Sequence, residues 1–201
     1  GVELKAKSLI SVTEISYQAL HQVSDKAESM LLTDLLAGVR AGLEAAAFNG
    51  SGSSGQPLGV INTTGVGAVS YGAASPTRAQ LLSQLDQLAA AGVDLSAVQW
   101  VCHPQMAVKL YSVLDAASRP IYDGERMLGL PVKVSSNCPA TKVIVGDWRQ
   151  CAVPIWARME VVRASARGGL RADGSERYRA MVLADVGVLR PAAFSVGTST
   201  S

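Results

Sequence analysis

The sequence contains few of the side chains that build catalytic and metal sites. Among 201 residues it has only two histidines and three cysteines: His21, His103, Cys102, Cys138 and Cys151. The cysteines are odd in number and widely spaced, and no C-x-x-C occurs, which argues against a disulfide framework or a zinc site. His103 precedes a proline at an expected helix start, so we predict a capping or surface role for it. Cys102 lies in an apolar run, which is typical of a buried, inert thiol.

Charge and aromatic residues are also scarce. Charged residues make up 17% of the chain and the net charge is +2, without any block of Lys and Arg, which argues against nucleic-acid binding through a basic face. The dispersed tryptophans favour packing over a platform for stacking bases. No run of 18 apolar residues could span a membrane and no signal peptide opens the chain, so we expect no membrane partner.

Residues 49–60, NGSGSSGQPLGV, contain the pattern G-x-G-x-x-G. A dinucleotide-binding loop must follow a buried strand and open a helix, whose N-terminus holds the pyrophosphate. Here the preceding sequence has the pattern of a helix, and the following residues, Pro57 to Ile61, favour extended chain. The phosphate-loop alternative fails because Gln56 and Pro57 stand where Lys and Ser or Thr are required. We therefore interpret this stretch as a turn that ends a helix.

The strongest predicted element is the helix before this turn, over residues 24–49. Its apolar residues recur about every 3.6 positions, which gives one apolar stripe: Leu32, Leu35, Leu36, Val39, Leu43, Ala46 and Ala47. Ser24 or Asp25 could cap its start, and Asn49-Gly50 ends it. Gly38 and Gly42 are unfavourable inside a helix, and their spacing suggests close packing against other backbone.

The rest of the chain predicts an α/β layer followed by a long β-hairpin. A helix is predicted to start at Ser75-Pro76, with Ser75 as the cap. Residues 97–102, 132–136 and 142–147 are predicted strands, with a helix opening at His103-Pro104. From residue 151 two long strand-like runs are joined by a polar, turn-rich tip, and the residues from 196 onward, VGTSTS, are predicted as a tail.

No motif for known chemistry occurs in the sequence. H-E-x-x-H and G-x-S-x-G are both missing, and neither histidine has a recognisable base and orienting partner. The residues alone therefore describe an α/β protein with a long helix, a long hairpin and no visible active site.

Four stretches, taken in order, are similar to a known family. They are LLTDLLAGVRAGLEAAAFNGSGSSGQPLGVI (31–61), WVCHPQMAVKLYSVLDAASRPIY (100–122), LGLPVKVSSNCP (128–139) and VIVGDWRQCAVPIWARMEVVRAS…RYRAMVLADVGVLRPAAF (143–194). No single motif is specific, but their order and spacing resemble the Hong Kong 97-type major capsid protein of tailed phages over nearly the whole chain. The first stretch resembles the spine helix of that family and the turn after it, and the last resembles its peripheral hairpin and closing strand.

The resemblance implies an α+β capsid fold with a long spine helix, a long peripheral β-hairpin and an α/β axial domain. Residues 1–12 would be the end of an extended loop, residues 13–52 and 151–183 the peripheral domain, and residues 53–150 and 184–197 the axial domain. The turn would then be an inter-domain hinge formed by Asn49, Gly50, Gly52, Gly55, Pro57 and Gly59. Arg167, in the polar tip of the hairpin, would form an ion pair between subunits or be a solvated loop residue.

The same resemblance implies a structural protein, without catalytic, metal or cofactor-binding residues. It would be the major head subunit of a tailed phage or prophage, assembling with itself into the pentamers and hexamers of an icosahedral shell. The shell would enclose double-stranded DNA, contacted nonspecifically. The virion would be its location, after assembly in the bacterial cytoplasm with a portal, a scaffold and a maturation protease. The N-terminal arm and any scaffolding segment of the family are missing, so we expect the chain to be a piece of a longer product.

Two other hypotheses remain open from the sequence. A nanocompartment shell protein of the same fold, of the encapsulin type, would enclose a cargo enzyme in place of DNA. An uncharacterised intracellular enzyme would use His103 or Cys102, and would need a concave pocket with a perturbed titratable group.

Overall fold

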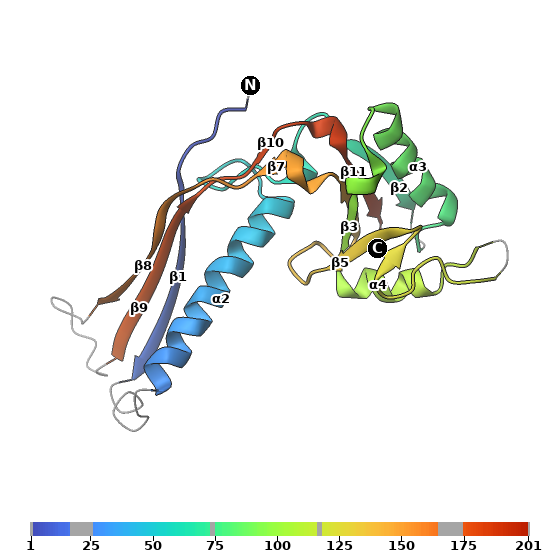
Figure 1. Cartoon of the computed structure of the whole chain (residues 1–201). Coiled ribbons are helices and arrows are strands. Elements are labelled where there is room, and N and C mark those ends of the chain that lie inside the picture. Colours follow the sequence, from blue (N-terminus) through green and yellow to red (C-terminus); the bar gives the residue numbers. More distant parts are fainter. Residues whose placement is uncertain (1, 17–25, 73–74, 116–117, 165–174, 201) are drawn as a thin grey trace. The chain divides into compact units, whose positions relative to one another are not determined.

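The computed structural model describes residues 2–16, 26–72, 75–115, 118–164 and 175–200 (Figure 1). Its helices are α2 (Lys26–Asn49), α3 (Arg78–Ala90) and α4 (Pro104–Tyr111), with short 3-10 turns at Val60–Asn62, Leu95–Ala97, Trp148–Gln150 and Pro191–Ala193. Its strands are β1 (Lys7–Ser16), β2 (Gly67–Gly72), β3 (Gln99–Cys102), β4 (Arg126–Met127), β5 (Leu130–Val134), β6 (Lys142–Gly146), β7 (Cys151–Ala152), β8 (Ile155–Ala164), β9 (Ser175–Ala184), β10 (Gly187–Val188) and β11 (Phe194–Ser199).

The chain divides into two compact units. Unit 1 comprises Gly1–Glu3, Ala45–Val153 and Val186–Ser201, and unit 2 comprises Leu4–Glu44 and Pro154–Asp185. The predicted domain boundary between residues 12 and 13 falls inside β1, which is one continuous strand.

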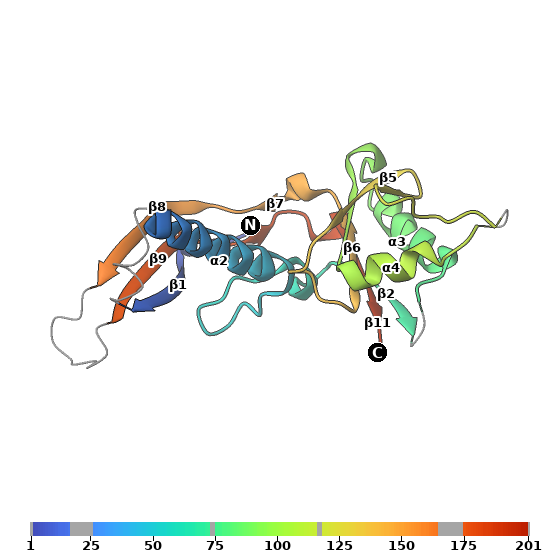
Figure 2. The same cartoon turned by 90° about the horizontal axis from the view of Figure 1, so that it is seen from below.

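Unit 2 is a three-stranded antiparallel sheet with α2 packed on one face (Figures 1 and 2). The strand order is β1-β9-β8, with Lys7 opposite Ala184 and Ser16 opposite Ser175. Leu35 and Val39 of α2 are buried against alternate residues of β9, which are Tyr178, Ala180 and Val182. The apolar stripe predicted for the helix therefore meets one side of the pleated strand.

The two glycines inside α2 allow this close packing, but they do not face backbone as expected. A Cβ on Gly38 would lie 2.9 Å from Ser11 Oγ, and a Cβ on Gly42 would lie 3.4 Å from both Cδ atoms of Leu9. The neighbours are therefore β1 side chains. Each glycine lowers the intrinsic stability of the helix, and the contact with β1 offsets this cost.

Unit 1 contains a mixed six-stranded sheet with the order β2-β11-β6-β3-β5-β4. β2 and β11 are parallel, as are β3 and β5, whereas β6 runs antiparallel to both of its neighbours. Alternate residues of the central strands enter two different cores, as the two-residue period of a strand requires. Trp100 and Cys102 pack in the core beneath α3 and α4, and Val101 packs in the other core.

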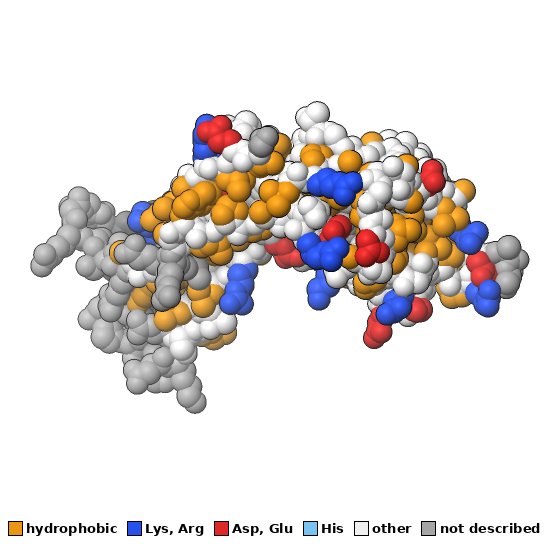
Figure 3. All heavy atoms as spheres, turned by 45° about the horizontal axis from the view of Figure 1, so that its top comes forward, with side chains coloured by type: hydrophobic (Ala, Val, Ile, Leu, Met, Phe, Trp, Pro, Cys, Tyr) orange, Lys and Arg blue, Asp and Glu red, His pale blue; other side chains and the backbone are white. Residues whose placement is uncertain are grey.

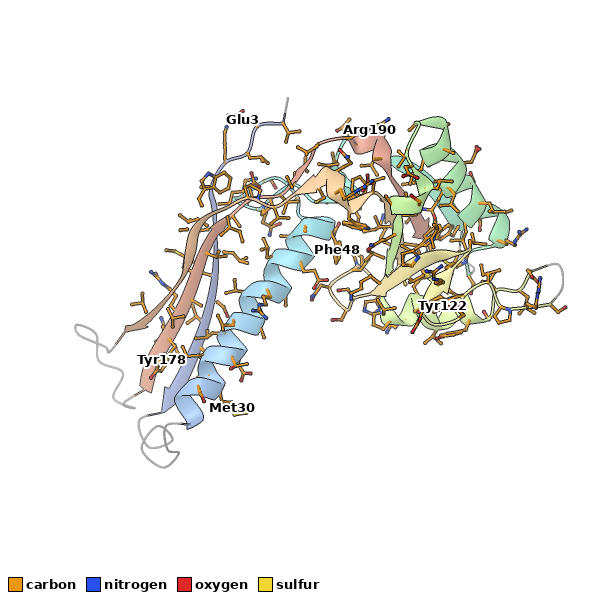
Figure 4. All side chains as sticks on the ribbon, viewed as in Figure 1. Glu3, Met30, Phe48, Tyr122, Tyr178 and Arg190 are labelled. Atoms are coloured by element: carbon orange, nitrogen blue, oxygen red, sulfur yellow. The ribbon has the colours of Figure 1, made fainter. Side chains whose placement is uncertain are left out.

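The second core of unit 1 receives the end of α2. Phe48 lies at that end (Figure 4), and its ring makes an edge contact with Trp148 at a centroid distance of 5.7 Å. Trp148 makes a second edge contact with Phe194 of β11, at 5.3 Å. These aromatic contacts join segments that are far apart in the sequence.

The start of α3 differs from the prediction, because the cap is Thr77 and not Ser75. The Thr77 hydroxyl accepts a hydrogen bond from the Gln80 backbone N–H, and the Thr77 N–H donates to Gln80 Oε1 at 2.8 Å. This reciprocal capping box satisfies two donors at once, which Ser75 cannot do from two residues earlier.

The terminal residues also differ from the prediction, because residues 196–199 of the expected tail belong to β11. This strand lies between β2 and β6, and so pairs on both sides. Its small and polar residues fit the environment: Thr198 Oγ1 accepts a hydrogen bond from Lys142 Nζ at 2.9 Å, and Ser199 is buried. Low hydrophobicity was therefore a poor guide to the position of this segment.

Candidate functional site

The glycine-rich turn after α2 is closed by backbone hydrogen bonds. The Gly52 N–H donates to Pro57 O at 3.0 Å, and the Gly59 N–H donates to Gly50 O at 2.9 Å. The Asn62 side-chain amide donates to Asn49 O and Gly50 O, at 3.2 and 3.0 Å, where α2 ends. The turn therefore returns the chain to the helix end that it left.

This geometry gives no support to phosphate binding. The turn follows the C-terminal end of a long helix, where the helix dipole carries partial negative charge, and it leads only into a three-residue 3-10 turn. A dinucleotide loop needs the opposite arrangement, with the turn at a helix N-terminus. The chain passes from unit 2 to unit 1 between Glu44 and Ala45, so the whole turn belongs to unit 1. A hinge role for the turn stays a prediction.

His103 and Cys102 do not form a catalytic pair in this structure. His103 caps α4, and its Nδ1 accepts a hydrogen bond from the Gln105 N–H at 3.2 Å. Cys102 is fully buried in the core, and burial raises the pKa of its thiol to about 11, which keeps it protonated and unreactive at neutral pH. Both findings agree with the roles predicted from sequence.

The described part of the chain contains no group of three or more His, Cys, Asp or Glu side chains that could hold a metal ion. Its cysteines are free thiols. None of the helices described here combines the length and the apolar character that crossing a membrane requires.

The face of the unit 2 sheet that points away from α2 has an unusual composition. The strand register places Ile10, Val12, Val162, Met181 and Leu183 on this face, because their neighbours in sequence pack toward the helix. Ile10 is 48% exposed, Val12 50% and Val162 38%. Figure 3 shows hydrophobic side chains gathered on the surface of the unit that holds this sheet. A solvated sheet face normally alternates to polar residues, so this face has the character of a binding surface.

One end of this outward face is polar. Glu14 of β1 lies opposite Arg177 of β9, and Arg177 Nε donates to Glu14 Oε1 at 2.7 Å. Arg179 lies in the next row of the same face, opposite Val12 and Val162, and is exposed. The outward face therefore combines an apolar centre with positive charge, which is a composition that suits contact with another protein.

A second apolar surface lies on the outer side of α4 in unit 1. Met106, Ala107 and Leu110 face the core, whereas Val108 is 69% exposed and Tyr111 49%. Tyr111 also contacts the ring of Tyr122, at a centroid distance of 4.7 Å. The outer side of this helix therefore carries two apolar side chains beside the exposed Gln105 and Lys109.

A charged group in unit 1 gives a prediction about acid stability. The Arg149 guanidinium donates two hydrogen bonds to Asp147, at 2.9 and 3.0 Å, and holds the pKa of that carboxyl below its ordinary value. Because the folded pKa is depressed, this contribution to stability is present above the unfolded pKa of about 3.9 and is lost as the pH falls through the folded pKa. We expect Asp147→Asn to cost about 1 kcal/mol at pH 7 and to flatten the decline in stability below pH about 4.

Urea unfolding followed by tryptophan fluorescence, repeated from pH 7 to pH 3, measures this effect. Asp115→Asn is the matched control, because Asp115 also pairs with an exposed arginine, Arg119, but its side chain is 24% exposed, against 7% for Asp147. Exposed pairs contribute about 0 to 1 kcal/mol, so the control should change the pH profile less. Identical pH profiles for Asp147→Asn and the unmodified protein would contradict the prediction.

Sequence comparison decides the family. A sequence model of the Phage capsid family matches residues 2–199. The chain belongs to the Phage capsid family. No curated protein is significantly similar to it in sequence.

Solved structures agree with this family in their fold. A chain from the structure of Gordonia phage Cozz matches with a TM-score of 0.74 at 16% identity, over 98% of this chain and 71% of that chain. The capsid of an empty GTA particle, computed with C5 symmetry, matches with a TM-score of 0.76 at 18% identity, over 98% and 74%. The holo-SrpI encapsulin complex from Synechococcus elongatus matches with a TM-score of 0.67 at 17% identity, over 96% and 73%. The predicted α+β capsid fold is confirmed.

Membership of the capsid family identifies a structural, non-enzymatic protein of the phage head that assembles with itself into a shell. The hypothesis of an enzyme that uses His103 or Cys102 is therefore not supported. Arg167, the predicted contact between capsid subunits, lies outside the described residues. The outward sheet face of unit 2 was missed in the sequence, because the alternation in residues 2–15 is loose and does not show which side chains face α2.

Proposed function

We propose that this capsid protein is the major head subunit of a tailed phage or prophage. In this proposal it forms the pentamers and hexamers of an icosahedral shell around double-stranded DNA, which it contacts nonspecifically. The observation that carries the proposal is the capsid-family match over residues 2–199. The virion is its location, and we propose assembly in the bacterial cytoplasm with a portal, a scaffold and a maturation protease as partners.

The division of the chain into two units supports the domain assignment in the proposal. Unit 2, with α2 and the β8–β9 hairpin, has the elements expected of a peripheral domain over residues 13–52 and 151–183. Unit 1, with the six-stranded sheet, has the elements expected of an axial domain over residues 53–150 and 184–197. In the domain assignment the turn Asn49–Gly59 links the two domains, whereas the passage between the two units falls earlier, between Glu44 and Ala45.

We also propose that the outward sheet face of unit 2 contacts a neighbouring subunit. When a second surface covers apolar side chains that are half-exposed in the free chain, the association is stabilised by about 25 cal/mol per Å² of apolar area buried. A shell needs such surfaces on every subunit, and this face extends over three paired strands. The positive charge at Arg179 adds specificity to the contact.

Substitution of Val12 tests the shell and this surface together. Val12→Glu places a carboxylate in the outward face opposite Arg179, so we expect shell formation by the complete gene product to fall at least about tenfold, since the contact would lose apolar area and would have to desolvate an ion pair, which costs several kcal/mol. Stability of the free subunit should change by less than about 1 kcal/mol, because Val12 is half-exposed there. Negative-stain electron microscopy and sedimentation measure the shells, and thermal unfolding measures the subunit.

The control is Val12→Thr, which keeps the β-branched shape and should keep shell formation. Shells of normal yield from Val12→Glu would contradict the role of this face and leave the capsid proposal intact. Small particles only from the unmodified gene product, under several salt conditions, would contradict the capsid proposal itself.

The encapsulin hypothesis is the second candidate, because an encapsulin complex is among the similar structures. Its TM-score of 0.67 is lower than the value of 0.76 for the GTA capsid, and the family match is to phage capsids. The contents of purified shells distinguish the two. Nuclease-protected DNA supports the phage head, and a single co-purifying enzyme supports the nanocompartment.

A further inference from the structure

Asp185 lies just beyond the end of β9 and has an almost fully buried side chain. Its carboxylate is 4% exposed and forms an ion pair with Lys7 Nζ at 3.1 Å, where the Lys7 side chain is 23% exposed. Its second oxygen accepts a hydrogen bond from the Lys5 backbone N–H at 2.9 Å. Its own backbone N–H donates to Pro154 O at 3.3 Å. These four residues, Lys5, Lys7, Pro154 and Asp185, are called the Asp185 cluster below, and all of them belong to unit 2.

The cluster extends the contacts of β1 past the end of its strand. The ladder between β1 and β9 ends with Lys7 opposite Ala184. Lys5 lies two residues before the first residue of β1 and belongs to no strand, yet its N–H donates a hydrogen bond to Asp185. Asp185 therefore holds a segment that the sheet itself does not hold.

The position of the cluster in the chain is also unusual. The chain passes between the two units at residues 3–4, 44–45, 153–154 and 185–186. Lys5, Pro154 and Asp185 each lie within two residues of a different one of these passages. Asp185, through its carboxylate and its backbone N–H, thus joins three of the four segments that enter or leave unit 2.

We propose that Asp185 is a positioning residue that fixes the direction in which the chain before β1 leaves unit 2. The charge on Asp185 holds Lys5 and Lys7, and its loss loosens residues 4–6 without opening the sheet. This inference rests on the proposed function, in which residues 1–12 are the end of an extended loop that reaches toward other subunits. When the direction of the loop base is already fixed in the free subunit, less conformational entropy is lost as the shell forms.

Limited trypsin digestion of the free subunit tests the proposal, because Lys5 and Lys7 are themselves cleavage sites. We expect Asp185→Ala to raise the rate of cleavage after Lys5 at least about tenfold, since local opening makes the segment available to the protease. Hydrogen exchange in Leu9–Thr13 and in α2 around Leu35 should remain as slow as in the unmodified protein. Mass spectrometry identifies both the cleavage site and the exchanging peptides.

Two further variants separate the ion pair from general stability. Lys7→Met removes the ammonium and leaves the Lys5 hydrogen bond, so it should raise cleavage after Lys5 less than Asp185→Ala does. Asp185→Asn keeps the shape of the side chain and removes its charge. If Asp185→Ala does not fold, the cleavage rate of Asp185→Asn decides the question by the same measurement.

Cleavage after Lys5 within twofold of the unmodified rate in Asp185→Asn and Asp185→Ala would overturn the proposal. Fast exchange spreading through Leu9–Thr13 and α2 in both Asp185 variants would also overturn it, because Asp185 would then support the whole unit. These measurements use the unassembled subunit. Failure to form shells therefore bears on the proposed function, whereas the cleavage rates bear on Asp185 alone.

Discussion

Gly59→Ala is expected to destabilise unit 1 by more than about 4 kcal/mol, a loss reserved for changes that disturb a core or force the backbone apart. A Cβ at Gly59 would lie 2.5 Å from Gly50 N, 2.7 Å from Asn49 N and 2.7 Å from the carbonyl carbon of Phe48. These are backbone atoms at the end of α2, and they cannot turn aside as a flexible side chain can. With a total stability of about 5 to 15 kcal/mol, a domain that loses this much is partly unfolded at 37 °C.

The strain in Gly59→Ala comes from overlap of the added Cβ with neighbouring atoms and not from an unfavourable φ angle. Gly59 has φ of −75°, which any residue adopts. Gly55, in the same turn, has φ of +79°, and a Cβ added there would have no atom of the described residues within 4 Å beyond its chain neighbours. Gly55→Ala should therefore cost only the left-handed penalty of about 1 to 2 kcal/mol.

Urea unfolding of the two alanine variants, followed by tryptophan fluorescence, makes the comparison. Gly55→Ala should lower the urea concentration at the unfolding midpoint modestly and leave the slope of the transition unchanged. Gly59→Ala should lower that midpoint severely or yield no folded protein. Equal midpoints for the two variants would contradict the close approach between the turn and the end of α2.

These two glycines also show what the sequence could and could not predict about the turn. The glycines, Pro57 and the preceding apolar period indicated that a helix ends in a turn near Asn49, and α2 ends at that residue. The sequence pattern does not distinguish one glycine of the turn from another. The reason for each glycine depends on where Gly50 and Phe48 lie in space, which only the folded backbone determines.

The core was predictable where the pattern is local, and the outward surface was not. The strands near residues 99–102 and 142–146 were expected from apolar runs, and both are central strands of unit 1. The outward face of unit 2 depends on the pairing of β1 with β9, for example Val12 with Arg179. A shift of one residue in that register would exchange the buried and exposed sets, so residues 7–16 alone do not determine which side chains face water.

The prediction for the terminal segment failed for a related reason. β11 has few large apolar residues, and its stability comes from partners far away in sequence. Gly197 lies beneath the ring of Tyr71 on the neighbouring strand, where a Cβ would overlap the Tyr71 hydroxyl and Cζ and would lie 2.5 Å from Cε2. Burial raises the pKa of the Tyr71 phenol, so the hydroxyl stays protonated and donates to Gln84 Oε1. Gln84 is fully buried, and its amide reaches Val143 O at 3.4 Å.

Gly197→Ala is therefore expected to destabilise unit 1 by about 3 kcal/mol, because the added methyl displaces a buried ring that holds a hydrogen-bonded network. Tyr71→Ala should cost about 3 to 5 kcal/mol, since it leaves a cavity and removes the hydrogen-bond donor of the buried Gln84 Oε1. The double variant should cost little more than Tyr71→Ala alone, because the methyl then occupies space that the ring has left. The expected coupling is about 1 to 3 kcal/mol.

Urea unfolding of the four proteins measures this coupling directly, and the fluorescence of Trp100, in the same core as Tyr71, reports the transition. Costs that add in the double variant would mean that the ring and the glycine do not share the same space, and β11 would then lie elsewhere than between β2 and β6. A strong coupling would show instead that a segment of Gly, Thr and Ser belongs to the core of unit 1. In that case the small side chains of β11 are required by their neighbours, and a larger residue at Gly197 would be tolerated only where position 71 has become smaller.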